Sequence, residues 1–182
     1  MRIPFQKSVA GGRYGPALSQ LVHGGLIIGL LAALAHFADS SFLFPSLGPT
    51  AFLLLHAPAT HSASPRNTLV GHLAGAVLGW LSLAAFGLLD APSALAAGVD
   101  WPRAGAAALS LGATGAVMVL LDAPHPPAGA TTMIVSLGLM PHLWQIPVLM
   151  TAVLLLTGQA FVVHRLAGTP YPLWKRHDPP IL

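Results

Sequence analysis

The chain has 182 residues, of which 54% are hydrophobic and only 7% are charged, and its mean hydropathy is +0.72. A solvated surface needs far more charge, so the composition excludes an ordinary soluble domain. The net charge of +3 does not indicate nucleic-acid binding, because the basic residues flank long uncharged runs. No cysteine is present, which excludes disulfides and thiol chemistry. The composition indicates a protein of the lipid bilayer.

Four apolar segments are long enough to cross a hydrocarbon core of about 30 Å, which takes about 20 helical residues. They cover residues 18–38, 68–89, 103–121 and 143–165. The first run continues past the signal-peptide-like residues 33–35, so we interpret it as a membrane span. Gly71, Gly75 and Gly79 have the spacing of small residues in closely packed membrane helices, which could serve internal packing or oligomerisation. The sequence predicts an all-α, polytopic transmembrane helix bundle.

Two further apolar segments, residues 46–57 and 127–140, are too short to cross the bilayer as helices. Each follows a break rich in proline. In the second break Pro124, Pro126 and Pro127 remove three backbone donors and bar a continuous helix. Broken backbone at membrane depth is tolerated where it faces protein or a water-filled cavity. Each short segment is therefore predicted to be a half-helix or a re-entrant limb.

The two breaks share a pattern, because residues 45–50 and 126–131 both read Pro-x-x-Gly-x-Thr. Each is preceded by a long apolar run and followed by a short run, a turn and another long run. We interpret this order as two three-segment repeats, about 18–89 and 103–165, within one membrane domain covering 1–182. The tail, residues 166–182, is predicted to anchor in the headgroup region through Tyr171 and Trp174.

The basic residues predict the orientation of the chain in an inner or plasma membrane. If both termini are cytoplasmic, six of the eight basic residues lie inside: Arg2, Lys7, Arg13, Arg165, Lys175 and Arg176. Six crossings place Arg66 inside and Arg103 outside, whereas four crossings with two re-entrant limbs exchange them. The charge rule does not separate these topologies. We expect six crossings, because the repeats are then inverted and both half-helices start toward one central site.

The starts of the half-helices are the predicted anion site, because a helix N-terminus offers unpaired N–H groups and the positive end of its dipole. Glycines would let the backbone approach a ligand, and hydroxyls would add donors. The predicted substrate-binding residues are Ser46, Gly48, Thr50, His125, Pro126, Pro127, Gly129, Thr131 and Thr132. No catalytic residue, metal ligand or cofactor site is predicted.

Five polar residues near the breaks have both a functional and a structural interpretation. His125 could bind an anion when protonated or couple proton movement to transport, or it could fix the Pro-Pro turn through a backbone hydrogen bond. His72 could bond a half-helix or line the cavity. Arg66 and Asn67 could form an anion vestibule or stop the next span from sliding. Asp122 could relay protons with His125 or cap the short helix.

At these residues the sequence resembles the HPP family of integral membrane proteins, which is named for its His-Pro-Pro motif. The resemblance rests on residues 121–134 and 46–79, including Pro65-Arg66-Asn67 followed by Gly71-His72, and covers about residues 20–165. It implies a transporter, since plant chloroplast and cyanobacterial relatives are associated with nitrite uptake. The family more often has Gly-Ala-Ser where this chain has Gly48-Pro49-Thr50, so the ligand here could differ.

Three other classes of function are considered. Nine histidines suggest metal transport, but no His-x3-His pair and no acidic partner within the spans is present. An enzyme is not expected, because the chain has no nucleophile elbow, no HExxH motif and no carboxylate pair. A membrane scaffold or sensor subunit would be favoured if Phe44, Phe52 and Met133 filled the space between the breaks. We expect a small inorganic anion as the ligand, and a homo-oligomer in the lipid bilayer.

Overall fold

The computed structural model describes residues 14–39 and 43–175. Its first long helix is continuous but carries three labels, α1 (Tyr14–Ser19), the π-helix η2 (Gln20–Gly24) and α2 (Gly25–Phe37). The next elements are α3 (Leu47–His56), η3 (His61–Ala63), α4 (Pro65–Ala85), α5 (Ala94–Ala97), α6 (Trp101–Leu120), α7 (Ala128–Ser136) and α8 (Gln145–Leu166). Every element in these ranges is helical, which confirms the predicted all-α class. Arg2, Lys7, Arg13 and Arg176, on which the predicted orientation partly depends, lie outside them.

Four helices are long and apolar enough to cross a membrane, namely residues 17–37, 65–85, 101–120 and 145–166. They coincide with the four predicted spans to within a few residues at each end. The two short helices α3 and α7 occupy the two short apolar segments, each directly after its proline-rich break. Because the rise is about 1.5 Å per residue, neither short helix reaches across a bilayer alone.

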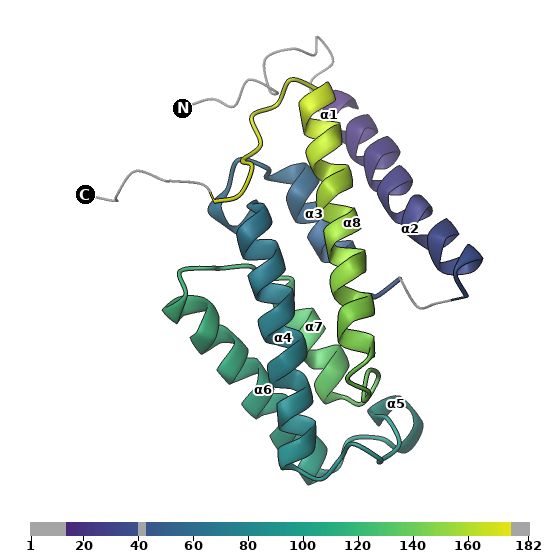
Figure 1. Ribbon diagram of the computed structural model, residues 1–182, viewed down its shortest axis with the longest axis vertical. Coiled ribbons are helices and arrows are strands. Elements are labelled where there is room, and N and C mark those ends of the chain that lie inside the picture. Colours follow the sequence, from purple (N-terminus) through teal and green to yellow (C-terminus); the bar gives the residue numbers. More distant parts are fainter. Residues whose placement is uncertain (1–13, 40–42, 176–182) are drawn as a thin grey trace.

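The six segments alternate in direction along the chain (Figure 1). In that view the first long helix runs downward, α3 returns upward and α4 runs downward, whereas α6, α7 and α8 run upward, downward and upward. The first three segments therefore have the opposite sense to the last three. This order is compatible with the six-crossing interpretation, in which each break and its short helix together complete a crossing.

The helices pack in two groups, and each group contains the last long helix of the other predicted repeat (Figure 1). In the first group, which we call the α4 bundle, α4 packs against both α6 and α7. In the second, the α8 bundle, α8 packs against the first long helix and α3. Each bundle thus combines two segments of one predicted repeat with the third segment of the other. Contacts between α4 and α8 join the two bundles.

The glycine stripe of α4 packs inside the protein. A Cβ atom at Gly71 would lie 2.8 Å from Cβ of His125, and one at Gly75 would lie 2.8 Å from the carbonyl oxygen of Ala128. At Gly79 it would lie 2.8 Å from Cβ of Val135. The stripe therefore lets the α4 backbone lie directly on α7, which decides between the two roles considered for it in favour of internal packing.

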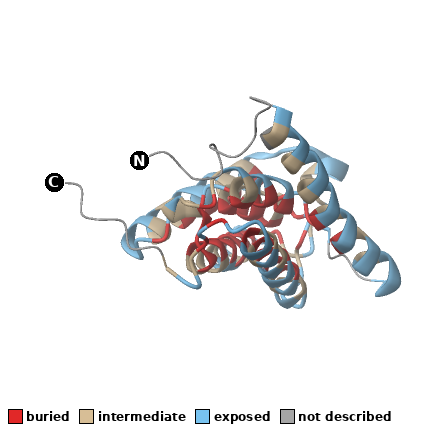
Figure 2. Ribbon diagram, turned by 90° about the horizontal axis from the view of Figure 1, so that it is seen from above, coloured by how far each residue is buried: buried red, intermediate tan, exposed pale blue. Residues whose placement is uncertain are grey.

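Buried residues line the faces that the helices turn toward one another, and the outward faces are exposed (Figure 2). Many of the exposed side chains are large and apolar, such as Leu73 and Leu81 on α4 and Leu154 on α8. Such a surface suits contact with lipid chains. The tail differs from its predicted role, because Tyr171 is buried and its hydroxyl donates to the carbonyl of Ala63 at 2.8 Å. Tyr171 thus joins the core, while Trp174 stays exposed.

Candidate functional site

Threonines of both breaks bind the same histidine. His72 lies two turns into α4, directly after Gly71, and its side chain contacts both α3 and α7. Its Nε2 atom lies 2.8 Å from Oγ1 of Thr50 on α3, and its Nδ1 atom lies 2.6 Å from Oγ1 of Thr131 on α7. All three side chains are buried. The last positions of the two Pro-x-x-Gly-x-Thr motifs therefore meet on one imidazole ring.

His125 completes this group, which we call the imidazole cluster (Thr50, His72, His125 and Thr131). Its Nε2 atom lies 3.3 Å from Nε2 of His72, and the two ring centroids are 5.0 Å apart. Its Nδ1 atom lies 2.9 Å from the carbonyl oxygen of Ser62, in the turn before α4. His125 therefore makes the backbone bond expected of a scaffolding histidine and also contacts the other imidazole.

The positions of the hydrogens follow from the carbonyl acceptors. The single hydroxyl hydrogen of Thr50 goes to the carbonyl of Ser46 at 2.9 Å, so Nε2 of His72 must donate to the Thr50 oxygen. A neutral His72 then has a bare Nδ1, which accepts from the hydroxyl of Thr131. His125 donates from Nδ1 to Ser62, so its Nε2 is an acceptor toward His72. With both imidazoles neutral, the Thr50 oxygen and Nε2 of His125 share the single Nε2–H of His72, and every other donor of the cluster has its own acceptor.

Two more hydroxyls of the predicted site, those of Ser46 and Thr132, are buried on the same two half-helices. Ser46, at the start of α3, is completely buried, and its Oγ atom has no hydrogen-bond partner among the described residues. Thr132 is also buried and accepts a hydrogen bond of 3.2 Å from Thr114 on α6. Buried polar groups are normally paired, so the Ser46 hydroxyl is a free donor that needs an explanation. Thr114 is a member of this polar interior that the sequence did not single out.

The backbone donors at the starts of the half-helices are already used, contrary to the expectation of unpaired N–H groups. The N–H groups of Leu47 and Gly48 donate to the carbonyls of Phe44 and Pro45, and Pro49 has none. At α7, the N–H groups of Ala128, Gly129 and Ala130 donate to the carbonyls of His125, Pro126 and Pro127. The turns before the two helices therefore cap them. A ligand at these helix starts would meet the positive ends of the helix dipoles but no free backbone N–H group.

A groove of about 400 Å³ lies between the two breaks. It is lined by Pro49, Phe52, Leu53, Pro126, Pro127 and Ala130, all of them apolar. Gly48 is exposed, and a Cβ atom there would meet nothing within 4 Å, whereas one at Gly129 would lie 3.6 Å from Leu111. The predicted prolines therefore line this groove, while the predicted hydroxyl groups and His125 are buried in the cluster. Neither glycine lies against another backbone.

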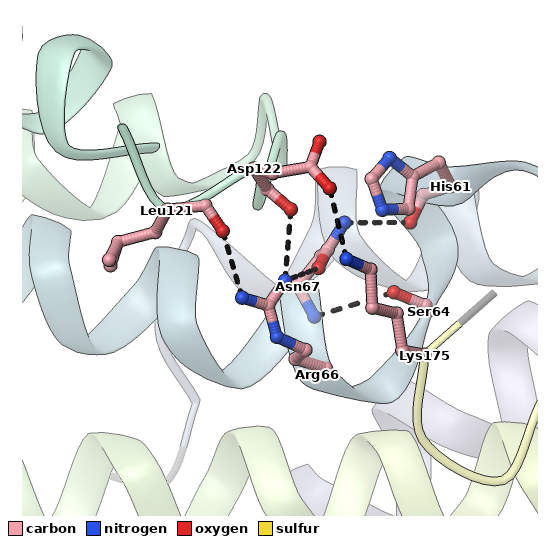
Figure 3. A network of polar contacts seen from close by, with 7 residues as sticks. All are labelled: His61, Ser64, Arg66, Asn67, Leu121, Asp122 and Lys175. Carbon is pink, nitrogen blue, oxygen red and sulfur yellow. Dashed lines mark hydrogen bonds and ion pairs between the residues drawn. The ribbon is translucent and has the colours of Figure 1, made fainter. Parts of the chain in front are cut away.

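Arg66 caps a neighbouring helix (Figure 3). Its guanidinium donates to the carbonyls of Leu121 at 2.8 Å and Asp122 at 2.9 Å, and to the side-chain oxygen of Asn67 at 3.1 Å. Leu121 is the C-cap of α6, where carbonyls lack partners within the helix and the dipole favours a cation. Asn67 is buried and donates to the carbonyl of His61 at 3.0 Å. Both residues thus fix the ends of the spans next to the cluster.

Asp122 neither caps α7 nor bonds to His125, the two roles considered for it. The N-cap of α7 is Pro127, and the Asp122 carboxylate instead accepts from Nζ of Lys175 at 3.0 Å (Figure 3). This hydrogen bond and the charge of Lys175 lower the pKa of Asp122. The pair is exposed and ties the tail to the loop that precedes the His-Pro-Pro motif.

Arg103, near the start of α6, is buried and is not part of the cluster. Its Nη2 atom donates to the carbonyl of Pro92 at 2.6 Å, and its Nη1 atom has no partner among the described residues. A Cβ atom at Gly138 would lie 2.8 Å from that Nη1, so the guanidinium packs closely under the end of α7. Across the described residues, no group of three or more histidine or acidic side chains could hold a metal ion.

Comparisons with known proteins agree with the resemblance drawn from the motifs. A family profile described as "HPP, transmembrane region" matches residues 11–172. Among curated proteins, a transmembrane protein of Dictyostelium discoideum is 31% identical over 143 residues. That match covers 72% of this chain but 43% of the relative, so the chain spans less than half the length of that protein. No solved structure matches the chain.

Proposed function

Because the chain belongs to the HPP family of membrane proteins, we propose that it carries a small inorganic anion across the bilayer, with nitrite as the leading candidate. The observation that carries the proposal is the meeting of two half-helices on His72, through Thr50 and Thr131. Polar and ionisable side chains within membrane spans are costly and usually mark a transport pathway. Discontinuous helices that converge from two related halves are a common plan of secondary transporters.

The donors that would bind the anion are side chains. The Ser46 hydroxyl, which has no partner among the described residues, lies at the start of α3, and the hydroxyls of Thr50 and Thr131 would become donors to an anion once their bonds within the cluster break. The N-terminal ends of α3 and α7 carry partial positive charge, which favours an anion without any buried lysine. The acidic residues that the structure describes, Asp39, Asp90, Asp100 and Asp122, lie outside the long helices, so none of these four repels an anion there.

The proposed site is closed in this conformation. Thr50, His72 and His125 have no exposed surface and Thr131 has 1%. An anion would reach them only if α3 moved away from α4, which would break the Thr50–His72 bond and widen the groove between the breaks. We interpret the structure as an occluded state of a carrier. Alternating opening on the two sides would then move the α8 bundle against the α4 bundle.

The test is anion uptake into proteoliposomes that contain the purified protein. Nitrite, nitrate, formate and chloride are compared one at a time, and protein-free liposomes measure the unaided leak of nitrous acid. We expect saturable nitrite uptake above that leak. His125→Ala should abolish it, because it removes an acceptor of the cluster, while the protein remains folded by circular dichroism and size-exclusion chromatography.

Thr157→Val is the matched control. Thr157 is a buried threonine of α8 whose hydroxyl bonds only to the carbonyl of Val153 in its own helix. The substitution removes the same chemical group from a place outside the cluster, so uptake should stay within about twofold of the parent protein. If no anion enters through folded parent protein, the transport proposal is wrong.

A scaffold or sensor subunit is the second candidate, and one observation favours it. The imidazole cluster is completely paired and the groove beside it has only apolar side chains, with Phe52 among them and Phe44 buried nearby in the core. A purely structural cluster would look the same. In that case His125→Ala would lower the unfolding temperature, and neither the variant nor the parent protein would transport an anion.

A further inference from the structure

We infer that His72 is a proton-binding site and that one proton crosses together with each anion. This inference rests on the proposed transport function and names its coupling. It starts from the hydrogen count of the cluster, in which neutral His72 donates from Nε2 to Thr50 and accepts at Nδ1 from Thr131. The bare Nδ1 atom is the one place on His72 where a proton can be added.

Adding that proton keeps every contact of the cluster. A new N–H bond forms at Nδ1, and Thr131 changes from donor to acceptor across the same 2.6 Å. The other contacts of the ring stay as they are, since Nε2 still donates to Thr50 and still faces the bare Nε2 of His125. Protonating His125 instead would set two N–H groups against each other at 3.3 Å. The geometry therefore favours His72 over His125 as the proton carrier.

The same proton prepares the site for an anion. Once Thr131 accepts from Nδ1, its own hydroxyl hydrogen is released and can turn toward a ligand. The site then holds a positive imidazolium and a free donor on α7, and the buried Ser46 hydroxyl at the start of α3, which has no partner among the described residues, would be a further donor. An oxyanion such as nitrite takes up hydrogen bonds of this kind, and they are stronger when one partner is charged.

Proton and anion depend on each other because the cluster is buried. A charged imidazolium without a counter-ion is strongly disfavoured in such a place, and the span residues provide no carboxylate to pair with it. The anion alone would lack both the charge and the Thr131 donor. One proton and one monovalent anion together are neutral, so they bind and leave as a pair.

The surroundings of His72 contain few competing charges. His125 is the titratable residue in contact with it, and α7 contains none. The titratable and charged groups on the other nearby elements have other partners. On α8, His164 bonds to the carbonyl of Leu54 and Arg165 lies over the ring of Phe161. Arg66 and Arg103 bond to loop carbonyls, His56 on α3 stacks on Phe52, and His61 on η3 lies beside Asp122 (Figure 3).

The test separates the two driving forces for nitrite entry into proteoliposomes. In one arm an acidic outside provides a pH gradient, and valinomycin with equal potassium on both sides holds the membrane potential at zero. In the other arm the pH is equal and a potassium gradient with valinomycin makes the inside positive. A neutral proton–anion pair responds to the pH gradient alone, so we expect at least tenfold faster entry in the first arm after subtraction of the protein-free leak.

Three variants locate the proton. His72→Gln keeps an amide that can hydrogen-bond but not titrate, and it should remove the response to the pH gradient. Thr131→Val should do the same, and Thr131→Ser should restore it. Thr157→Val should behave as the parent protein does. In weakly buffered detergent solution, nitrite binding should take up one proton per anion in the parent protein and none in His72→Gln, a readout that a purely structural role would not move.

The outcomes separate the inferred proton coupling from the proposed anion transport on which it rests. Entry that follows the pH gradient and ignores the potential supports proton coupling. Entry that follows the potential and ignores the pH gradient overturns proton coupling and leaves the anion transporter intact. If folded protein gives no entry above the leak in either arm, the proposed function fails and the coupling fails with it.

Discussion

Thr50 and Thr131 hydrogen-bond to opposite nitrogens of the His72 ring, one at 2.8 Å and the other at 2.6 Å. They occupy the same position of the two Pro-x-x-Gly-x-Thr motifs, so the chain brings equivalent points of its two breaks to a single side chain. His72 thereby joins α3 of the α8 bundle to α7 of the α4 bundle. A change that moves α3 or α7 should therefore alter the hydrogen bonds of His72.

Gly71→Ala should push against His125 and so disturb the imidazole cluster. Its new Cβ atom would lie 2.8 Å from Cβ of His125 and 3.2 Å from Cβ of Ala128, both of which are fixed close to the backbone. We expect a loss of about 2 kcal/mol in the free energy of unfolding, as for other overpacked interiors. Thermal unfolding in detergent measures it. Gly112→Ala on the exposed face of α6 is the control, since nothing lies within 4 Å there.

Gly79→Ala and Gly105→Ala should differ although both create close contacts. At Gly105 a Cβ atom would lie 2.5 Å from the ring of Phe86, which is 40% exposed and can turn aside. At Gly79 it would meet Cβ of Val135 at 2.8 Å and the carbonyl of Thr132 at 3.0 Å. We expect Gly105→Ala to unfold within a few degrees of the parent protein and Gly79→Ala to unfold clearly earlier. Equal effects would mean that α7 can slide along α4.

Arg66→Lys should loosen the end of α6. The guanidinium spans the carbonyls of Leu121 and Asp122 at once, which a single ammonium group cannot do with the same geometry. We expect a loss of about 1 kcal/mol, the size of a helix-end contact with a charged partner. Hydrogen–deuterium exchange should show faster exchange in residues 117–123. If exchange there is unchanged, Arg66 does not hold this helix end.

Asp122→Asn should act mainly above the ordinary carboxyl pKa of 3.8. Because Lys175 lowers the pKa of folded Asp122, the pair stabilises the protein above that value, and the contribution is lost as the pH falls toward the lowered pKa. The unfolding temperatures of parent and variant should therefore differ at pH 6, and the difference should shrink as the pH is lowered below 3.8. The pair is exposed, so added salt should also shrink the difference. A difference independent of pH would contradict this assignment.

Tyr171→Phe should release the tail from the core. Burial raises the pKa of the Tyr171 phenol, so its hydroxyl is a donor at all ordinary pH values, and it bonds to the carbonyl of Ala63 at 2.8 Å. Losing this bond should cost about 1 kcal/mol. Limited proteolysis after residue 166 should become faster, while Leu173→Ala on the exposed part of the tail should leave the rate unchanged.

The sequence predicted the helices well because the length of each apolar run determines which kind of helix it can form. The four spans and both short segments were confirmed, since charges, prolines and turns mark their ends. The bundle pairing was not predictable in this way. That α4 joins α6 and α7 while α8 joins the first long helix depends on which helix faces fit, and the similar apolar surfaces of the helices do not specify this.

The candidate site stays a prediction as a binding site, but the structure shows where its residues lie. Ser46, Thr50, His125, Thr131 and Thr132 are all buried, and Thr50, His125 and Thr131 meet at His72. A bond from His72 to one half-helix was among the interpretations considered, but its contact with both half-helices at once was not predicted. The capped backbone donors could not be foreseen, because they depend on the turn geometry of the breaks.

The exchange of long helices between the two bundles limits how a site between them can open. Gly71, Gly75 and Gly79 let α4 lie directly on α7, which follows the second break, so we expect α7 and α4 to move as one rigid body. The loops that follow the short helices α3 and α7 each connect one bundle to the other, so these two loops must then act as hinges. A crosslink within either bundle should leave the protein free to cycle, whereas a short crosslink between α3 and α4 should lock it, so paired cysteines would map the moving boundary without any knowledge of the ion.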